Sequence, residues 1–119
     1  MRFAQALAAK DADGMRAVLA DGLDVRAMTP GRFWEPASVD EFVDGVVLRK
    51  WFSERDDILD LESVVESSVG GRHRVDYQVR VENADGVQLV EQVAYYDLDA
   101  DDRIGLLRII CSGYRPIDA

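Results

Sequence analysis

The chain has 119 residues, the usual length of one domain, and a domain of this size buries roughly 65% of the surface of its unfolded chain. Its formal net charge of -9 predicts an acidic surface that repels nucleic-acid phosphates and anionic lipids, so we expect neither nucleic acid nor a membrane as a partner. Cys111 is the single cysteine, which excludes an intrachain disulfide, and no apolar run approaches the ~20 residues of a membrane span. The opening MRFAQALAAK lacks the pattern of a signal peptide, so we expect a cytoplasmic protein with a single domain over residues 1–119.

The first fifth of the chain predicts two short helices. Apolar residues recur at helical spacing over residues 2–10, and residues 11–14 combine a helix stop with a new N-cap. The second helix uses Met15, Val18 and Leu19 as its apolar side. Asp21-Gly22 is expected to end this helix.

A short strand, a loop and a third helix follow. Residues 23–27 alternate between apolar and charged side chains, which predicts a strand, and residues 29–31 read as a loop. Ser38 and Glu41 have the spacing of a capping box. Behind them, one apolar face predicts a helix that runs to about Trp51.

From Ile58 onward the hydrophobic period is two, which indicates strands of about ten residues each. Turn signals at residues 70–71, 85–86 and 99–102 divide this part into four consecutive strands that must pair antiparallel. We therefore predict an α+β fold, with three N-terminal helices packed on a strongly curved antiparallel sheet. Such a sheet forms a cone-shaped half-barrel whose internal pocket is the default ligand site.

Two segments carry a resemblance to a known family. The opening RFAQALAAKDADGMRAVLADGLDV and the ending VEQVAYYDLDADDRIGLLRII resemble the nuclear-transport-factor-2-like superfamily, which includes SnoaL-like cyclases, scytalone dehydratase and ketosteroid isomerase. The resemblance covers almost the whole chain. It implies a cone-shaped fold with a hydrophobic pocket, frequently in a dimer.

The reactive positions of ketosteroid isomerase are not matched. That chemistry needs an aspartate base and an oxyanion hole made of a tyrosine and a protonated aspartic acid. The resemblance puts Phe3, Ala27 and Ala94 at these three positions. We therefore do not expect ketosteroid isomerisation. The SnoaL-like cyclases also tend to use an aspartate near Ala94, so the resemblance implies no catalytic residue.

The face of the strands that lines the pocket follows from the expected register. A turn over residues 83–86 places Tyr77 opposite Gln92 and His73 opposite Tyr96. One face then carries Val75, Tyr77, Val79, Val81, Val90, Gln92, Ala94, Tyr96 and Leu98. The resemblance makes this the inner face and adds Leu107, Ile109 and Cys111; a slip by one residue would invert the assignment.

Three polar residues interrupt this apolar face. Tyr77, Gln92 and Tyr96 are suited to orient a small organic ligand, although the tyrosines could equally be core residues whose hydroxyls reach the pocket mouth or a buried water. We expect the apolar walls to come from Phe3, Leu7, Leu19, Trp34, Leu107 and Ile109. Trp34 is either a lid over the pocket or a cap on the core. Cys111 is read as a small buried hydrophobe and not as a nucleophile.

Other candidate groups favour structural roles. His73 lies beside a turn and is expected to be solvated, although it could act as a general base. On the outer face, Glu91 is expected to pair with Arg80 or Arg108. The apolar residues of that face suggest a homodimer, and they are Leu89, Val93, Tyr95 and Ile110.

No metal or cofactor is expected. The acidic residues 97–102 lack the glycine and the distal glutamate of a calcium loop, and with one histidine and one cysteine we expect no zinc site within the chain. The leading hypothesis is a SnoaL-like protein that binds a small hydrophobic or amphipathic molecule; whether it is also a lyase- or isomerase-like enzyme stays open. The alternative is a dimerisation or accessory module. A cavity of roughly 300 Å³ or more reached past Trp34 favours binding, and a solid core favours the module.

Overall fold

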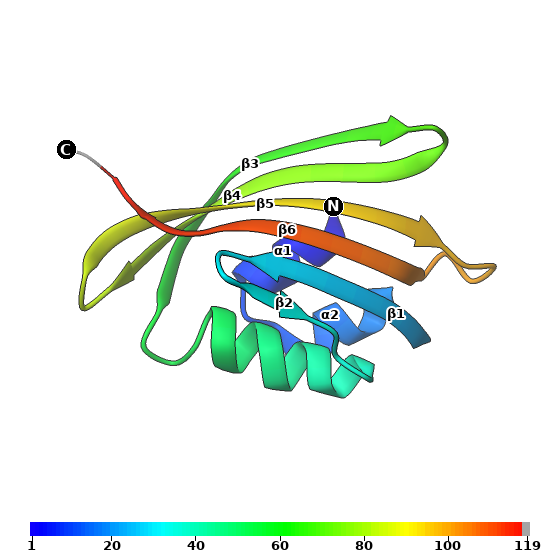
Figure 1. The fold of residues 1–119 in the computed structure, drawn as a ribbon, viewed down its shortest axis with the longest axis horizontal. Coiled ribbons are helices and arrows are strands. Elements are labelled where there is room, and N and C mark those ends of the chain that lie inside the picture. Colours follow the sequence, from blue (N-terminus) through cyan, green and yellow to red (C-terminus); the bar gives the residue numbers. More distant parts are fainter. Residues whose placement is uncertain (118–119) are drawn as a thin grey trace.

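Three helices pack on one side of a curved six-stranded sheet (Figure 1). The computed structural model describes residues 1–117, so the last two residues of the predicted domain lie outside the described part. The helices are α1 (Arg2–Ala8), α2 (Ala12–Val18) and η1 (Glu41–Trp51), and the strands are β1 (Leu19–Thr29), β2 (Arg32–Trp34), β3 (Asp57–Val69), β4 (Arg72–Asn83), β5 (Gly86–Leu98) and β6 (Ile104–Pro116). None of the helices has the length and apolar character needed to cross a membrane.

The sheet is mixed and open, which corrects the prediction of an antiparallel sheet. Its order is β2-β1-β6-β5-β4-β3, and the predicted antiparallel hairpins of β3 to β6 are confirmed. However, β1 pairs parallel with β6. A parallel pair needs a long crossover, here most of the chain, and no local pattern in the sequence specifies such a partner.

The first strand starts earlier than predicted. The second helix ends at Val18, and Leu19 is already the first residue of β1. The Asp21-Gly22 pair, expected as a helix stop, lies in an irregular part of β1, where the pairing with β6 shifts between Leu19 and Asp24. A β-bulge can accommodate turn-forming residues within a strand, so the prediction that Asp21-Gly22 ends the helix was wrong.

The segment after β1 is a hairpin and not only a loop. Pro30 and Gly31 (φ 73°) have the residues and the positive φ of a type II turn, and they pair β1 with β2. In this hairpin Trp34 lies opposite Ala27. The turn therefore sends Trp34 to the same sheet face as the core residue Ala27.

The predicted register of β4 and β5 is confirmed. Tyr77 pairs with Gln92, and His73 pairs with Tyr96. The inner-face residues of these strands are buried except Leu98, and they share one core with Phe3, Leu7 and Phe42 from the helices. Burial of this apolar face against the helices fixes the register, because a slip by one residue would expose it.

The start of the third helix confirms the Ser38 half of the predicted capping box, whereas Glu41 binds the residue before Ser38. The Ser38 hydroxyl accepts a hydrogen bond from the Glu41 backbone N–H (3.1 Å), and the Glu41 carboxylate accepts one from the backbone N–H of Ala37 (2.8 Å). From Glu41 on, the helix has π-type hydrogen bonding. It buries Phe42, Val43 and Trp51, so it supplies one wall of the interior.

A polar clamp holds the loop that follows η1. The Asp56 carboxylate accepts hydrogen bonds from the Ser53 backbone N–H (3.1 Å) and from Asn83 Nδ2 (3.0 Å). From the end of α1, Lys10 Nζ donates to the carbonyl oxygens of Ser53 (2.7 Å) and Asp56. The clamp fixes the position of the neighbouring Phe52.

The clamp predicts a pH dependence of stability. Burial raises the pKa of Asp56, but hydrogen bonds from Asn83 and Ser53 outweigh this effect and hold it below the ordinary 3.8. A carboxylate with a lowered folded-state pKa contributes stability above its unfolded pKa, and this contribution is lost as the pH falls through the folded value. Asp56→Asn should therefore lower the free energy of unfolding by about 1 kcal/mol at pH 7 and by less below pH 3. Urea unfolding at both pH values checks this; an equal loss at both would contradict it.

Candidate ligand-binding cavity

Four aromatic side chains run through the interior between the helices and the sheet. Trp34 contacts Trp51 edge to face, with ring centroids 6.2 Å apart, and Trp51 contacts Phe42 in the same way at 6.0 Å. Phe42 then stacks on Phe3 at 6.2 Å with an angle of 12° between the rings. These rings fill the middle of the interior and leave one hollow at each end of the series.

The first hollow lies beside the two tryptophans and has a volume of about 180 Å³. We call it the tryptophan cavity. It is lined by Thr29, Trp34, Lys50, Trp51, Phe52, Val90, Gln92, Cys111, Gly113 and Tyr114. These residues come from β1, β2, the end of η1, β5 and β6, so the cavity is formed by segments that lie far apart in the sequence.

Trp34 is held as a wall of this cavity. Its indole Nε1 donates a hydrogen bond to Thr29 Oγ1 (2.8 Å), across the tight turn between β1 and β2. The guanidinium of Arg32 lies over the indole ring, 3.6 Å from its centre, and makes a cation–π contact with it. Both contacts restrain the ring, so Trp34 forms one wall of the cavity in a defined orientation.

Tyr114 reaches the cavity because β6 carries a bulge. Cys111 pairs with Gln92 and Tyr114 with Val90, which puts one extra residue in β6 between these pairs. Gly113 supplies the positive φ (72°) that such a bulge favours, and a Cβ there would lie 3.0 Å from Pro30. The bulge turns Tyr114 to the inner face, where simple alternation after Cys111 would not place it.

A buried hydrogen-bonded pair, Tyr77 and Gln92, lies at the wall of the cavity. The Tyr77 hydroxyl donates a hydrogen bond to Gln92 Oε1 (2.5 Å), and both residues are 1% exposed. Burial raises the pKa of Tyr77 far above its ordinary value, with a smaller effect of Cys111. Gln92 Nε2 has no hydrogen-bond partner among residues 1–117, and neither has Nε1 of the buried Trp51.

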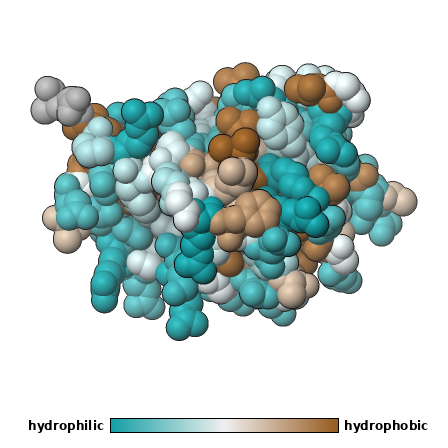
Figure 2. Space-filling model, in the orientation of Figure 1, coloured by the Kyte–Doolittle hydropathy of each residue, from teal (hydrophilic) through white to brown (hydrophobic). Residues whose placement is uncertain are grey.

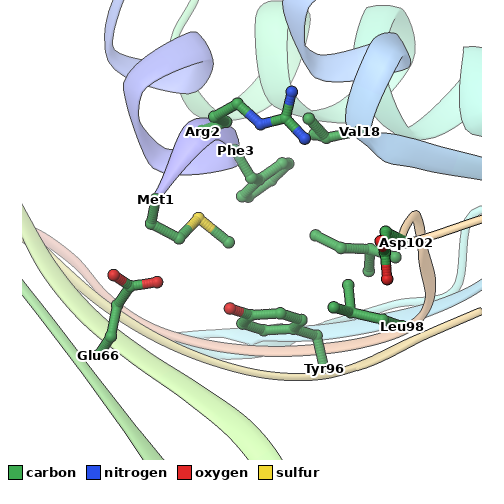
Figure 3. A pocket seen from close by; sticks show the side chains of 9 residues that line it. Met1, Arg2, Phe3, Val18, Glu66, Tyr96, Leu98 and Asp102 are labelled. Carbon is green, nitrogen blue, oxygen red and sulfur yellow. The ribbon is translucent and has the colours of Figure 1, made fainter.

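The second hollow lies beneath the first residues of the chain and measures about 350 Å³ (Figure 3). We call it the N-terminal hollow. Phe3 and Met1 form its roof and Tyr96 its floor, while Glu66 and Asp102 enter from opposite sides. The ring of Tyr96 stacks on the exposed His73 at 5.0 Å. Burial, and then the Glu66 carboxylate, raise the pKa of Tyr96, so its hydroxyl stays protonated near neutral pH.

The residues predicted to form one site are therefore divided. Trp34, Gln92 and Cys111 line the tryptophan cavity with Tyr77 bonded behind it, whereas Phe3 and Tyr96 line the N-terminal hollow. Four further predicted wall residues line neither hollow and lie in the solid core: Leu7, Leu19, Leu107 and Ile109.

The three positions compared with ketosteroid isomerase lie inside the core. Ala27 and Ala94 flank Ile109 in one row across β1, β6 and β5. Phe3, Ala27 and Ala94 are at most 2% exposed. Their side chains carry no group that could transfer a proton.

Several lining residues were not predicted from the sequence. Thr29 and Tyr114 could have been found from the Pro30-Gly31 turn and from Gly113, because these signals bring them to the inner face. Lys50 and Phe52 lie at the end of a correctly predicted helix, but no pattern pointed their side chains to a cavity. Glu66, which lines the N-terminal hollow, had no distinguishing signal in an edge strand.

The outer face of the sheet differs from the prediction in its ion pairs. Arg80 pairs with Glu62 (2.5 Å) and Arg108 with Asp24 (3.3 Å), so neither pairs with Glu91. The two arginines bind carboxylates on the strands β3 and β1. The prediction considered only Glu91 on β5 as their partner.

An apolar row crosses the same face. Phe33, Met28, Ile110 and Val93 are consecutive partners across β2, β1, β6 and β5. The first three are 52–54% exposed. Figure 2 shows apolar side chains gathered over this central part of the sheet, with hydrophilic ones on both sides.

Solved structures with this architecture define its class. The fold is that of nuclear-transport-factor-2-like proteins, with SnoaL-like and ketosteroid-isomerase-like structures among the matches, so the resemblance drawn from the sequence is confirmed at the level of the fold. No family model matches the sequence, and no curated protein matches it.

Three of these structures illustrate the similarity. A ketosteroid isomerase-like protein from Erwinia carotovora atroseptica SCRI1043 matches with a TM-score of 0.65 and 17% identity, over 97% of this chain and 90% of that one. An NTF-2 like protein from Burkholderia xenovorans LB400 gives 0.65 and 14%, over 99% and 81%. A SnoaL-like protein from Shewanella denitrificans OS-217 gives 0.65 and 9%, over 93% and 85%. At these identities the similarity establishes the fold and no activity.

Proposed function

We propose that the protein binds a small molecule with a single ring in the tryptophan cavity. The observation that carries this proposal is a hollow of about 180 Å³ between two tryptophans and a buried amide. A protein cavity of about 150 Å³ holds a benzene molecule, whereas drug-sized ligands need about 300 Å³ or more. The volume expected from the sequence is not reached beside Trp34, so the ligand is smaller than a steroid.

Binding without acid–base catalysis fits the residues of the cavity. Within the part of the chain that the structure describes, its ionisable lining groups are Lys50, Cys111 and Tyr114, with no carboxylate or imidazole among them. Burial, and then Asp56, raise the pKa of Tyr114 above its ordinary value, and its hydroxyl donates to the carbonyl oxygen of Trp51. Tyr114 is therefore a neutral structural group at pH 7, and none of the described lining residues is a poised general base.

Tryptophan fluorescence tests the proposal, because both tryptophans of the chain line the cavity. Titration with toluene or benzamide should give a saturable change of emission. Cys111→Leu, which extends a larger side chain into the cavity, should weaken binding about tenfold or more, while the near-isosteric Cys111→Ser should leave it unchanged. A wild-type protein that shows no saturable response to either probe would contradict the proposal.

The outer apolar row supports a second candidate, a homodimer formed through this face. Exposed Phe33, Met28 and Ile110 lie side by side, and a contiguous apolar patch in a water-soluble fold marks an interaction surface. A twofold dimer would place the same row on both protomers. As an accessory module, the protein would use this face in place of the cavity.

The dimer predicts a change of mass in one variant. Ile110→Asp puts a charge at the centre of the row and should convert the dimer into a monomer in analytical ultracentrifugation at micromolar concentration. Leu59→Asp is the matched control, because Leu59 is 51% exposed but lies on the edge strand β3, outside the row. A wild-type monomer, or two variants that behave alike, would refute the dimer.

A further inference from the structure

We propose that the ligand of the tryptophan cavity is a hydrogen-bond acceptor, namely a single-ring aromatic molecule that carries a carbonyl or carboxylate oxygen. This inference rests on the proposed function, since it assigns the chemistry of the molecule that fills the same cavity. It follows from the two unpartnered polar atoms among the described lining residues, Gln92 Nε2 and Trp51 Nε1, which are both donors.

The first donor is the amide nitrogen of Gln92, and its orientation is set by Tyr77. The buried Tyr77 hydroxyl must donate its proton, and Gln92 Oε1 is the acceptor that it contacts. Reversing the amide would leave the tyrosine O–H and the glutamine oxygen both unpartnered, whereas the observed orientation leaves only Nε2 without a partner. Gln92 Nε2 therefore keeps N–H groups free for an acceptor, and the Gln92 side chain belongs to the lining of the cavity.

The second donor is the indole nitrogen of Trp51. An indole N–H can only donate, and Nε1 of this buried side chain has no partner within the described residues. Trp34 shows the contrast, because its own Nε1 is bonded to Thr29. An acceptor oxygen on a ligand ring would satisfy Trp51 or Gln92, whose side chains both line the cavity.

The charge of the residues that line the cavity also favours a ligand that accepts hydrogen bonds. Lys50 lines the cavity and is exposed at its rim, and in the described part of the chain it has no ion pair or side-chain hydrogen bond. Among residues 1–117, no carboxylate lines the cavity to balance an incoming cation. An oxygen with partial or full negative charge is therefore favoured over an ammonium group.

Four probes of similar shape test this inference by calorimetric or fluorescence titration: toluene, benzamide, benzoate and benzylamine. We expect benzamide and benzoate to bind about tenfold or more tightly than toluene, and benzylamine to bind most weakly. Lys50→Met should weaken benzoate more than benzamide, which separates the carboxylate from the neutral carbonyl. Equal affinities of toluene and benzamide would overturn the acceptor assignment while leaving a binding cavity; failure of all four probes would remove the proposed function itself.

Two variants locate the donors. Gln92→Leu should reduce the preference for benzamide over toluene about tenfold, and Trp51→Phe, which removes the N–H but keeps a ring, should also reduce it. Gln88→Leu is the matched control, since Gln88 is buried on the same strand and lies outside the cavity lining. An unchanged preference in both cavity variants, or the same loss in the Gln88→Leu control, would overturn the proposal. The Trp51→Phe result decides the question if Gln92→Leu does not fold.

Discussion

Replacing Phe42 by alanine is expected to lower the free energy of unfolding by about 3–5 kcal/mol. Phe42 is fully buried and lies between Phe3 and Trp51, contacting one ring face to face and the other edge to face. Its removal takes away the contacts of both neighbours and leaves a cavity that the rigid sheet cannot close. Urea unfolding followed by circular dichroism measures the loss.

The same variant should change which ligands fit. Without the Phe42 ring, the space next to Trp51 is expected to extend toward Phe3, so naphthalene-sized probes should bind to Phe42→Ala but not to the wild type. Leu7→Ala is the control, because Leu7 is equally buried but lines neither hollow. This control should lose about 2–5 kcal/mol of stability with no change in ligand size. Binding of the larger probe to Leu7→Ala, or to neither variant, would show that the aromatic rings do not divide the interior.

The Tyr77–Gln92 pair should show strong coupling in a double-mutant cycle. Tyr77→Phe leaves both polar ends of a buried Gln92 without partners, and Gln92→Leu leaves the buried tyrosine hydroxyl alone, so each should cost about 1–3 kcal/mol. The double variant replaces both groups by apolar ones of similar shape and should be more stable than the sum of the single losses predicts, by about 1 kcal/mol or more. Chemical denaturation of the four proteins measures this coupling. Additive losses would mean that the hydroxyl and the amide do not depend on each other for hydrogen bonding.

The parts of the fold that follow local patterns were predictable. Alternating residues gave the hairpins of β3 to β6, and the Asn83–Gly86 turn set the register that brings Tyr77 to Gln92. Local alternation could not predict the parallel pairing of β1 with β6, because most of the chain lies between these two strands in the sequence. The bulge at Gly113 changed which residues face inward, and alternation alone misses Tyr114 for that reason.

The shape of the interior depends on side-chain volume, which the sequence pattern does not encode. The expectation of one pocket shared by Phe3, Trp34, Gln92 and Tyr96 treated the inner face as open space. The rings of Phe3, Phe42 and Trp51 instead fill its middle and separate Tyr96 from Gln92. Identifying the two hollows required the three-dimensional packing of helix residues against the sheet.

A crystal structure of the protein soaked with 4-bromobenzamide tests the central claim most directly, because the bromine atom gives an anomalous signal that locates the ligand. We expect one main peak in the cavity between Trp34 and Trp51, with the carbonyl oxygen of the probe within hydrogen-bond distance of Gln92 Nε2 or Trp51 Nε1. A main peak in the N-terminal hollow under Phe3 and Met1, or an empty tryptophan cavity at saturating probe, would contradict the account.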